Sequence, residues 1–233
     1  MSTSTLPVSP TTGEPITTIA RRGRVGLWFM IVADVAGTIA LVISYSYLWS
    51  LNVNGGWAPP GSTLTADETD STIPSDPKAS FAVEWPFWVI LLVVVVATVL
   101  MWFGYRSARR GHHAGLVVGT GLSLVVSVAA LVFQWIQMST FPFGAGDGAY
   151  ASAVLLLCAS NIFHLFLLIF IGMGIFARAR KGLIDKTNWY QAQAASYYMT
   201  WVCIAFLLGA ILTTIMVESP NVDPAIFGTF KQQ

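Results

Sequence analysis

The sequence predicts an all-α, polytopic membrane protein, a bundle of five transmembrane helices. Five long apolar runs fill most of its 233 residues. Hydrophobic residues make up 55% of the chain and charged residues only 10%, and the mean hydropathy is +0.67. In a typical soluble domain, about a quarter of the residues are charged. The composition therefore argues against a soluble protein.

The predicted helices are the apolar runs themselves, and each is long enough to cross a hydrocarbon layer of about 30 Å. They cover residues 25–49, 85–105, 114–138, 150–176 and 190–217. A polar tail, 1–21, precedes the membrane domain, 22–217, and lacks the basic start and apolar stretch of a signal peptide. A loop rich in Gly, Pro and acidic residues, 50–84, follows the first helix, and residues 218–233 form a C-terminal tail.

Basic residues are distributed unevenly among the polar segments that flank the predicted helices. Ten of the 12 Lys and Arg residues fall on one side of the five-span model: Arg21, Arg22, Arg24, Arg106, Arg109, Arg110, Arg178, Arg180, Lys181 and Lys186. The positive-inside rule makes this side cytoplasmic. We therefore expect the N-terminus inside, the 50–84 loop and the C-terminus outside, and a multi-pass location in the cell inner (plasma) membrane.

Asp34 is the first candidate site residue, because it lies about 14 Å into the first predicted helix at 1.5 Å per residue. A charged carboxylate near the bilayer midplane costs roughly 3 kcal/mol on insertion scales. We expect Asp34 to face protein, to be a neutral acid that donates a hydrogen bond, or both. It serves either as a helix-packing hydrogen bond or as a functional carboxyl in a proton-linked or lipid-linked role.

Two further polar pairs lie inside spans. Asn161 and His164 are three residues apart in the fourth predicted helix, on one helix face, at a depth that matches Asp34. We predict that the two faces meet, so that Asp34, Asn161 and His164 form an intramembrane polar seam. Gln134 and Gln137 repeat the spacing near the outer end of the third helix, where helix-to-helix hydrogen bonding is their expected role.

The sequence gives no sign of a redox centre in this chain. A bis-histidine haem needs two facing imidazoles, and His164 is the only histidine in a predicted span. His112 and His113 belong to a basic loop, where solvation at the interface is expected, and Cys158 and Cys203 are expected to be small buried side chains. No clustered ligands, phosphate loop, nucleophile elbow or nucleic-acid motif appears, so no catalytic, cofactor or metal residue is predicted.

The order of these features resembles subunit III of haem-copper oxidases such as cytochrome c oxidase. The stretch Gly26–Val35 (GLWFMIVADV) is similar to the family's opening helix, with Asp34 in place of an intramembrane glutamate. Gly55–Gly61 (GGWAPPG) resembles the family's outer-loop turn, represented by Trp57, Pro59, Pro60 and Gly61. The resemblance covers about Arg22 to Val217 and the shorter, five-helix bacterial form.

The chain departs from the family at several polar positions, as a divergent member would. Gln137 stands where the family has an acid, and Asn161 replaces the first of two histidines that are three residues apart. Thr200 and Cys203 stand where the family favours His and Asp in the last helix.

The resemblance implies a non-catalytic subunit that packs on catalytic subunit I of a respiratory terminal oxidase. Such a subunit binds phospholipid, supports proton uptake and turnover stability, and leaves haem and copper to its partner subunits. Two alternatives remain open at this point. One is a subunit-III-like accessory protein of a nitric oxide reductase, an alternative that the altered polar positions keep open. The other is a free-standing small-solute transporter.

Overall fold

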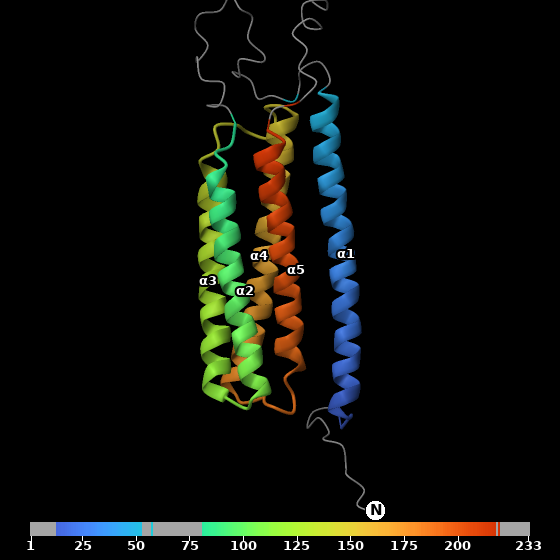
Figure 1. Ribbon diagram of the computed structural model, residues 1–233, viewed down its shortest axis with the longest axis vertical. Helices are drawn as coiled ribbons and strands as arrows, with labels where there is room; N and C mark the ends of the chain where they lie inside the picture. Colours follow the sequence, from blue (N-terminus) through green and yellow to red (C-terminus); the bar gives the residue numbers. More distant parts are fainter. Residues whose placement is uncertain (1–12, 53–56, 58–80, 218, 220–233) are drawn as a thin grey trace, which may run out of the picture. The chain divides into compact units, whose positions relative to one another are not determined.

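The computed structural model describes residues 13–52, 57, 81–217 and 219. These residues form helices and connections, with no β-strand among them. In order they are α1 (Ile16–Leu51), α2 (Trp85–Arg109), α3 (His113–Ser139), α4 (Ala149–Arg180) and α5 (Tyr190–Ile215) (Figure 1). All five are long and apolar enough to cross a membrane. The chain is therefore a multi-pass, all-α membrane protein, as its hydropathy predicts.

Helices are the expected secondary structure here because hydrocarbon offers no hydrogen-bond partner to the backbone, and an α-helix satisfies its own N–H and C=O groups. The shortest, α2, has 25 residues, or about 37 Å at 1.5 Å per residue. That length exceeds the hydrocarbon thickness of about 30 Å. Each helix can therefore extend beyond the apolar layer at its ends.

The helix bounds correct the sequence-based ranges mainly at the basic ends. The predicted tail 1–21 is too long, because α1 begins at Ile16, directly after Pro15. Proline is favoured beside a helix start, where its missing N–H costs no intrahelical bond. At the other end of the chain, α5 stops at Ile215, two residues short of its predicted end.

The ends of α2 and α4 extend past the predicted residues 105 and 176 through their arginines, and the same cap closes both. After α2, Gly111 has a φ of 76°, its N–H donates to Ala108 O at 2.9 Å, and His112 N–H donates to Ser107 O at 2.9 Å. After α4, Gly182 has a φ of 70°, its N–H donates to Ala179 O at 3.0 Å, and Leu183 N–H donates to Arg178 O at 3.0 Å. These are Schellman caps, which place glycine at the left-handed position.

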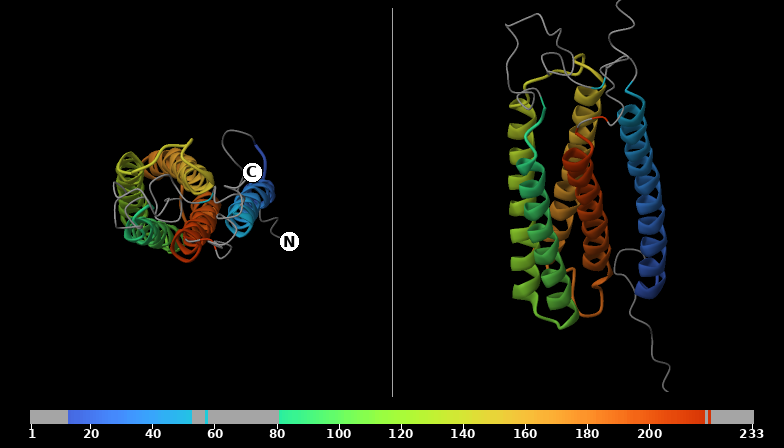
Figure 2. Two further views of the ribbon diagram at one scale, coloured as in Figure 1. Left: turned by 90° about the horizontal axis from the view of Figure 1, so that it is seen from above. Right: turned by 45° about the horizontal axis from the view of Figure 1, so that its top comes forward.

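The chain divides into two compact units, each of which contains segments of all five helices. Unit 1 comprises Met1–Ala36, Leu92–Leu131 and His164–Ile204, and unit 2 comprises Gly37–Leu91, Val132–Phe163 and Ala205–Gln233. Within unit 1, α2 and α3 run side by side (Figure 2), and Ser123 Oγ of α3 donates to Ala97 O of α2 at 2.8 Å. Their backbones approach closely because Gly119 has no side chain. A Cβ at this position would lie only 2.7 Å from Gly104 N.

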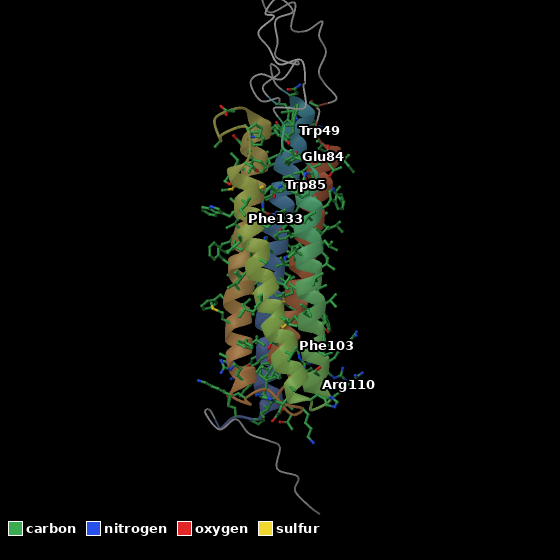
Figure 3. All side chains as sticks on the ribbon, turned by 90° about the vertical axis from the view of Figure 1, so that its left-hand side faces the viewer. Trp49, Glu84, Trp85, Phe103, Arg110 and Phe133 are labelled. Carbon is green, nitrogen blue, oxygen red and sulfur yellow. The ribbon has the colours of Figure 1, made fainter. Side chains whose placement is uncertain are left out.

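Unit 2 has a core of aromatic residues that includes part of the outer loop. Trp57, only 1% exposed, packs edge-on against Tyr45 and Tyr150, with ring centroids 5.3 and 5.5 Å away. Its indole N–H donates to Val217 O at 2.7 Å, and Tyr150 N–H donates to Trp57 O at 3.0 Å. In the same unit Trp85 of α2 lies beside Phe133 of α3 (Figure 3), with ring centroids 6.2 Å apart.

Candidate functional site

The candidate site is centred on Asp34, which lies within α1 and belongs to unit 1. His164 Nε2, from α4, lies 2.9 Å from Asp34 Oδ1 and 3.0 Å from Oδ2. The sequence-based prediction that these two side chains meet is confirmed. Both helices carry the pair within apolar sequence, so each residue offers the other a partner that hydrocarbon cannot supply.

Two residues of α5 complete the site. Trp201 Nε1 donates to Asp34 Oδ2 at 2.9 Å, and the Tyr198 hydroxyl donates to the same oxygen at 3.5 Å. An indole N–H can only donate, so Oδ2 is an acceptor. The expectation that Asp34 is a neutral acid that donates a hydrogen bond stays a prediction. We call Asp34, His164, Tyr198 and Trp201 the aspartate cluster.

The aspartate cluster is buried unevenly. The His164 side chain is 3% exposed, whereas that of Asp34 is 21% exposed. Oδ1 of Asp34 faces Nε2 of His164 whichever of the two carries the hydrogen between them. A neutral acid would donate to an unprotonated Nε2, and a carboxylate would accept from a protonated one. The two atoms are therefore within hydrogen-bond distance, with either one as the donor.

Sequence reasoning missed Tyr198 and Trp201. Most tryptophans of this chain lie near predicted span ends, where an amphipathic indole is favoured. Trp201 is different because it lies in the middle of α5. A buried indole N–H usually finds a hydrogen-bond partner, so Trp201 was a signal for a nearby acceptor. Tyr198 precedes it by three residues and shares its helix face.

Asn161 has a different partner from the one predicted. Its Nδ2 donates to Gln134 Oε1 at 3.4 Å, and Gln134 Nε2 donates to Gln137 Oε1 at 2.9 Å. All three belong to unit 2 and are at most 6% exposed. We call them the amide cluster. The predicted Gln134–Gln137 pair is thus directly bonded, and Asn161 joins it from α4 in place of Asp34.

The two positions of α5 that depart from the resembled family connect this helix to α2. Trp102 Nε1 donates to Thr200 Oγ1 at 2.9 Å, and Cys203 Sγ lies 3.0 Å from Thr98 Oγ1. Both contacts are within unit 1. Neutral contacts between helices therefore occupy both positions.

The remaining predicted residues lie apart from the aspartate cluster or outside the described part of the chain. Trp57 is the buried anchor of unit 2, while Pro59, Pro60 and Gly61 fall outside the described residues. Cys158 is fully buried, as expected of a small core side chain. His113, predicted at a solvated interface, has Nε2 2.9 Å from Ala179 O. Among the described residues, no group of three or more His, Cys, Asp and Glu is arranged to hold a metal ion.

Comparison with known proteins adds no family assignment. Neither the protein-family models nor the curated protein sequences gave a match to this chain.

Proposed function

We propose that this chain is a non-catalytic subunit III of a bacterial respiratory haem-copper terminal oxidase, located in the plasma membrane with its N-terminus in the cytoplasm. It packs on the catalytic subunit, which holds the haem and copper, and it supports proton uptake and turnover stability. The observation that carries the proposal is the Asp34–His164 pair, at 2.9 Å. This pair joins the two intramembrane motif positions, in α1 and α4, on which the family resemblance rests.

Three other features support the proposal. The five helices match the number in the short bacterial form of the family. The outer-loop motif residue Trp57 is built into the core of unit 2 through its bonds to Asn52 and Val217, as a structural motif would be. The segregated basic residues favour a cytoplasmic N-terminus.

The decisive experiment is purification of the tagged full chain from its native membrane in mild detergent. We expect a stable complex that contains haem, shows the absorption spectrum of a haem-copper centre and reduces oxygen. A complex that reduces nitric oxide but not oxygen would favour the reductase alternative. A chain that purifies alone and moves a solute in liposomes would establish the transporter alternative and refute our proposal.

A second experiment tests the role of Asp34 in the complex. Asp34→Asn keeps an acceptor oxygen for the Trp201 indole, whereas Asp34→Ala keeps none. We expect the Asn variant to keep most oxygen reduction and the Ala variant to lose its subunit, or its activity, sooner during turnover. Wild-type behaviour of both variants would show that this carboxyl has no part in the function.

A further inference from the structure

The amide cluster is a chain of hydrogen bonds that runs in one direction and stops at Gln137. Asn161 Nδ2 donates to Gln134 Oε1 at 3.4 Å, and Gln134 Nε2 donates to Gln137 Oε1 at 2.9 Å. Gln137 Nε2 is the last donor of the chain, and it has no hydrogen-bond partner in the described part of the protein. Gln137 is only 5% exposed, and bulk solvent does not reach its amide nitrogen.

The other buried polar side chains of α3 show how unusual this unpaired amide is. The hydroxyls of Thr120 and Ser127 donate to backbone carbonyls of α3, and that of Ser123 donates to Ala97 O of α2. Buried polar groups in native proteins are almost always paired. An unpaired one loses its hydrogen bonds to water and gains none, because hydrocarbon supplies none. Gln137 Nε2 therefore requires a partner from outside the described residues.

The chemistry of that partner follows from the two ways in which the amides can be oriented. Turning a carboxamide over exchanges its oxygen and its nitrogen. With all three amides turned over, Gln137 would donate to Gln134, Gln134 would donate to Asn161, and Gln137 Oε1 would be the unpaired atom. Gln137 thus presents an unpaired donor in one orientation and an unpaired acceptor in the other. A hydroxyl-type oxygen, which both accepts and donates, pairs with Gln137 in either orientation.

The position of Gln137 limits the size of the partner. Gln137 lies two residues before the end of α3 at Ser139, which is about 3 Å along the helix axis. Beside it, Met138 and Phe141 pack against the aromatic core of unit 2. The amide is thus close to the end of its helix but covered by protein. This position favours a single water molecule over a larger polar ligand.

We propose that Gln137 binds an internal water molecule, which completes the amide chain. Internal waters bind at buried polar groups that are otherwise unpaired, and they make about three hydrogen bonds. The Gln137 amide has two N–H groups. The fully buried Cys158 thiol, which borders Gln134, offers a further weak donor and acceptor. This site is independent of the oxidase proposal, because it rests only on the packing of unit 2.

The test detects water at the side-chain amides of the full chain, together with any subunits that accompany it, in proteoliposomes. Solid-state nuclear magnetic resonance of isotope-labelled protein, with a water-selective filter, keeps only the signals of amides that receive magnetisation from water. Gln134 is the internal control, because it is also a buried glutamine and its amide is bonded at both ends. Both side chains are assigned through their own backbone nitrogens, so the comparison needs no variant that could misfold.

We expect the Gln137 amide signal to pass the filter and the Gln134 signal to be lost. Thr140→Val removes a nearby exchangeable hydroxyl, which donates to Gln137 O at 2.8 Å, and the Gln137 signal should persist in this variant. Loss of both glutamine signals from the wild-type protein would overturn the proposal, because no water would then lie at the amide. Equal retention of both would also overturn it, since water would then enter the whole cluster. Loss of the Gln137 signal in Thr140→Val would assign the transfer to the hydroxyl and refute the water site.

Discussion

The aspartate cluster and the amide cluster both connect membrane helices through polar side chains, but they use different chemical groups. Each links α4 to another helix through buried polar side chains, and their α4 members, His164 and Asn161, are three residues apart. The amide cluster contains only neutral groups and cannot change its charge. The aspartate cluster contains a carboxyl group and an imidazole, which are both ionisable side chains. The comparison separates hydrogen bonds between neutral side chains from hydrogen bonds between ionisable ones.

The energetic consequences of breaking the two clusters differ for the same reason. A hydrogen bond between membrane helices contributes about 0.6 to 2 kcal/mol. Removing one partner of a buried ionisable pair typically costs 3–5 kcal/mol, because it leaves an uncompensated charge. The amide cluster should therefore tolerate substitution better than the aspartate cluster.

The largest effect is expected from His164→Ala, with Asn161→Ala as the matched change three residues away. His164→Ala removes the partner that lies within 3.0 Å of both Asp34 oxygens. We expect a loss of about 3 kcal/mol in the free energy of unfolding, against about 1 kcal/mol for Asn161→Ala. Reversible unfolding in mixed micelles measures both values.

The double variant D34N/H164A serves as the control for charge. It removes the carboxyl along with its partner, so it should be more stable than H164A alone. Equal losses in H164A and N161A would contradict the distinction between the two clusters.

The next largest effect concerns the centre of the amide cluster. Gln134 is fully buried, accepts from Asn161 and donates to Gln137. Gln134→Leu leaves both neighbours without this partner and should cost about 1–2 kcal/mol. Replacing all three residues by leucine removes the polar groups together and should recover most of that loss. A triple variant less stable than Q134L would contradict this expectation, because the loss could not then be explained by unpaired amide groups.

Trp201→Phe tests how much the α5 indole contributes to the aspartate cluster. The substitution keeps an aromatic ring and removes the N–H that donates to Asp34 Oδ2 at 2.9 Å. We expect a loss of about 1 kcal/mol. Trp135→Phe is the control, because Trp135 lies on α3 and is 59% exposed. The free energy of unfolding of the Trp135→Phe variant should change by only a few tenths of a kcal/mol. If Trp201→Phe lost no more stability than Trp135→Phe, the Trp201 hydrogen bond would not contribute to the stability of the aspartate cluster.

The sequence predicted the parts of this fold that depend on composition, and it missed those that depend on packing. Five spans follow from the lengths of apolar runs. The contact between Asp34 and His164 follows from depth, since each polar group at the same level needs a partner. The partner of Asn161 did not follow, because one helix face can point toward either of two neighbouring helices.

Helix ends and aromatic contacts were harder to predict than spans. Arginine is a good helix former, so α2 and α4 continue past their apolar runs until Gly111 and Gly182 end them. Hydropathy alone places an end where the apolar run stops. The sequence placed Trp57 in an outer-loop turn, whereas its side chain lies in the core of unit 2, where three hydrogen bonds satisfy its backbone and its indole.

The smallest effect is expected from Asp185, an aspartate that accepts hydrogen bonds outside the spans. The Thr187 hydroxyl, followed by the Thr187 and Asn188 amides, lowers the pKa of this carboxyl below its usual value of 3.8. A lowered pKa in the folded state adds stability that is present above the unfolded pKa and is lost as the pH falls through the folded one. The turn around Asp185 should therefore loosen only below about pH 4.

Hydrogen exchange of the Thr187 and Asn188 amides, expressed as protection factors to remove the intrinsic pH dependence, measures this effect. Asp185→Asn is the control, because its side chain keeps an acceptor oxygen and cannot titrate. Its protection should be lower than wild type near neutral pH and independent of pH in the acid range. Wild-type protection that stays constant down to pH 2 would mean that the charge of Asp185 does not hold the turn.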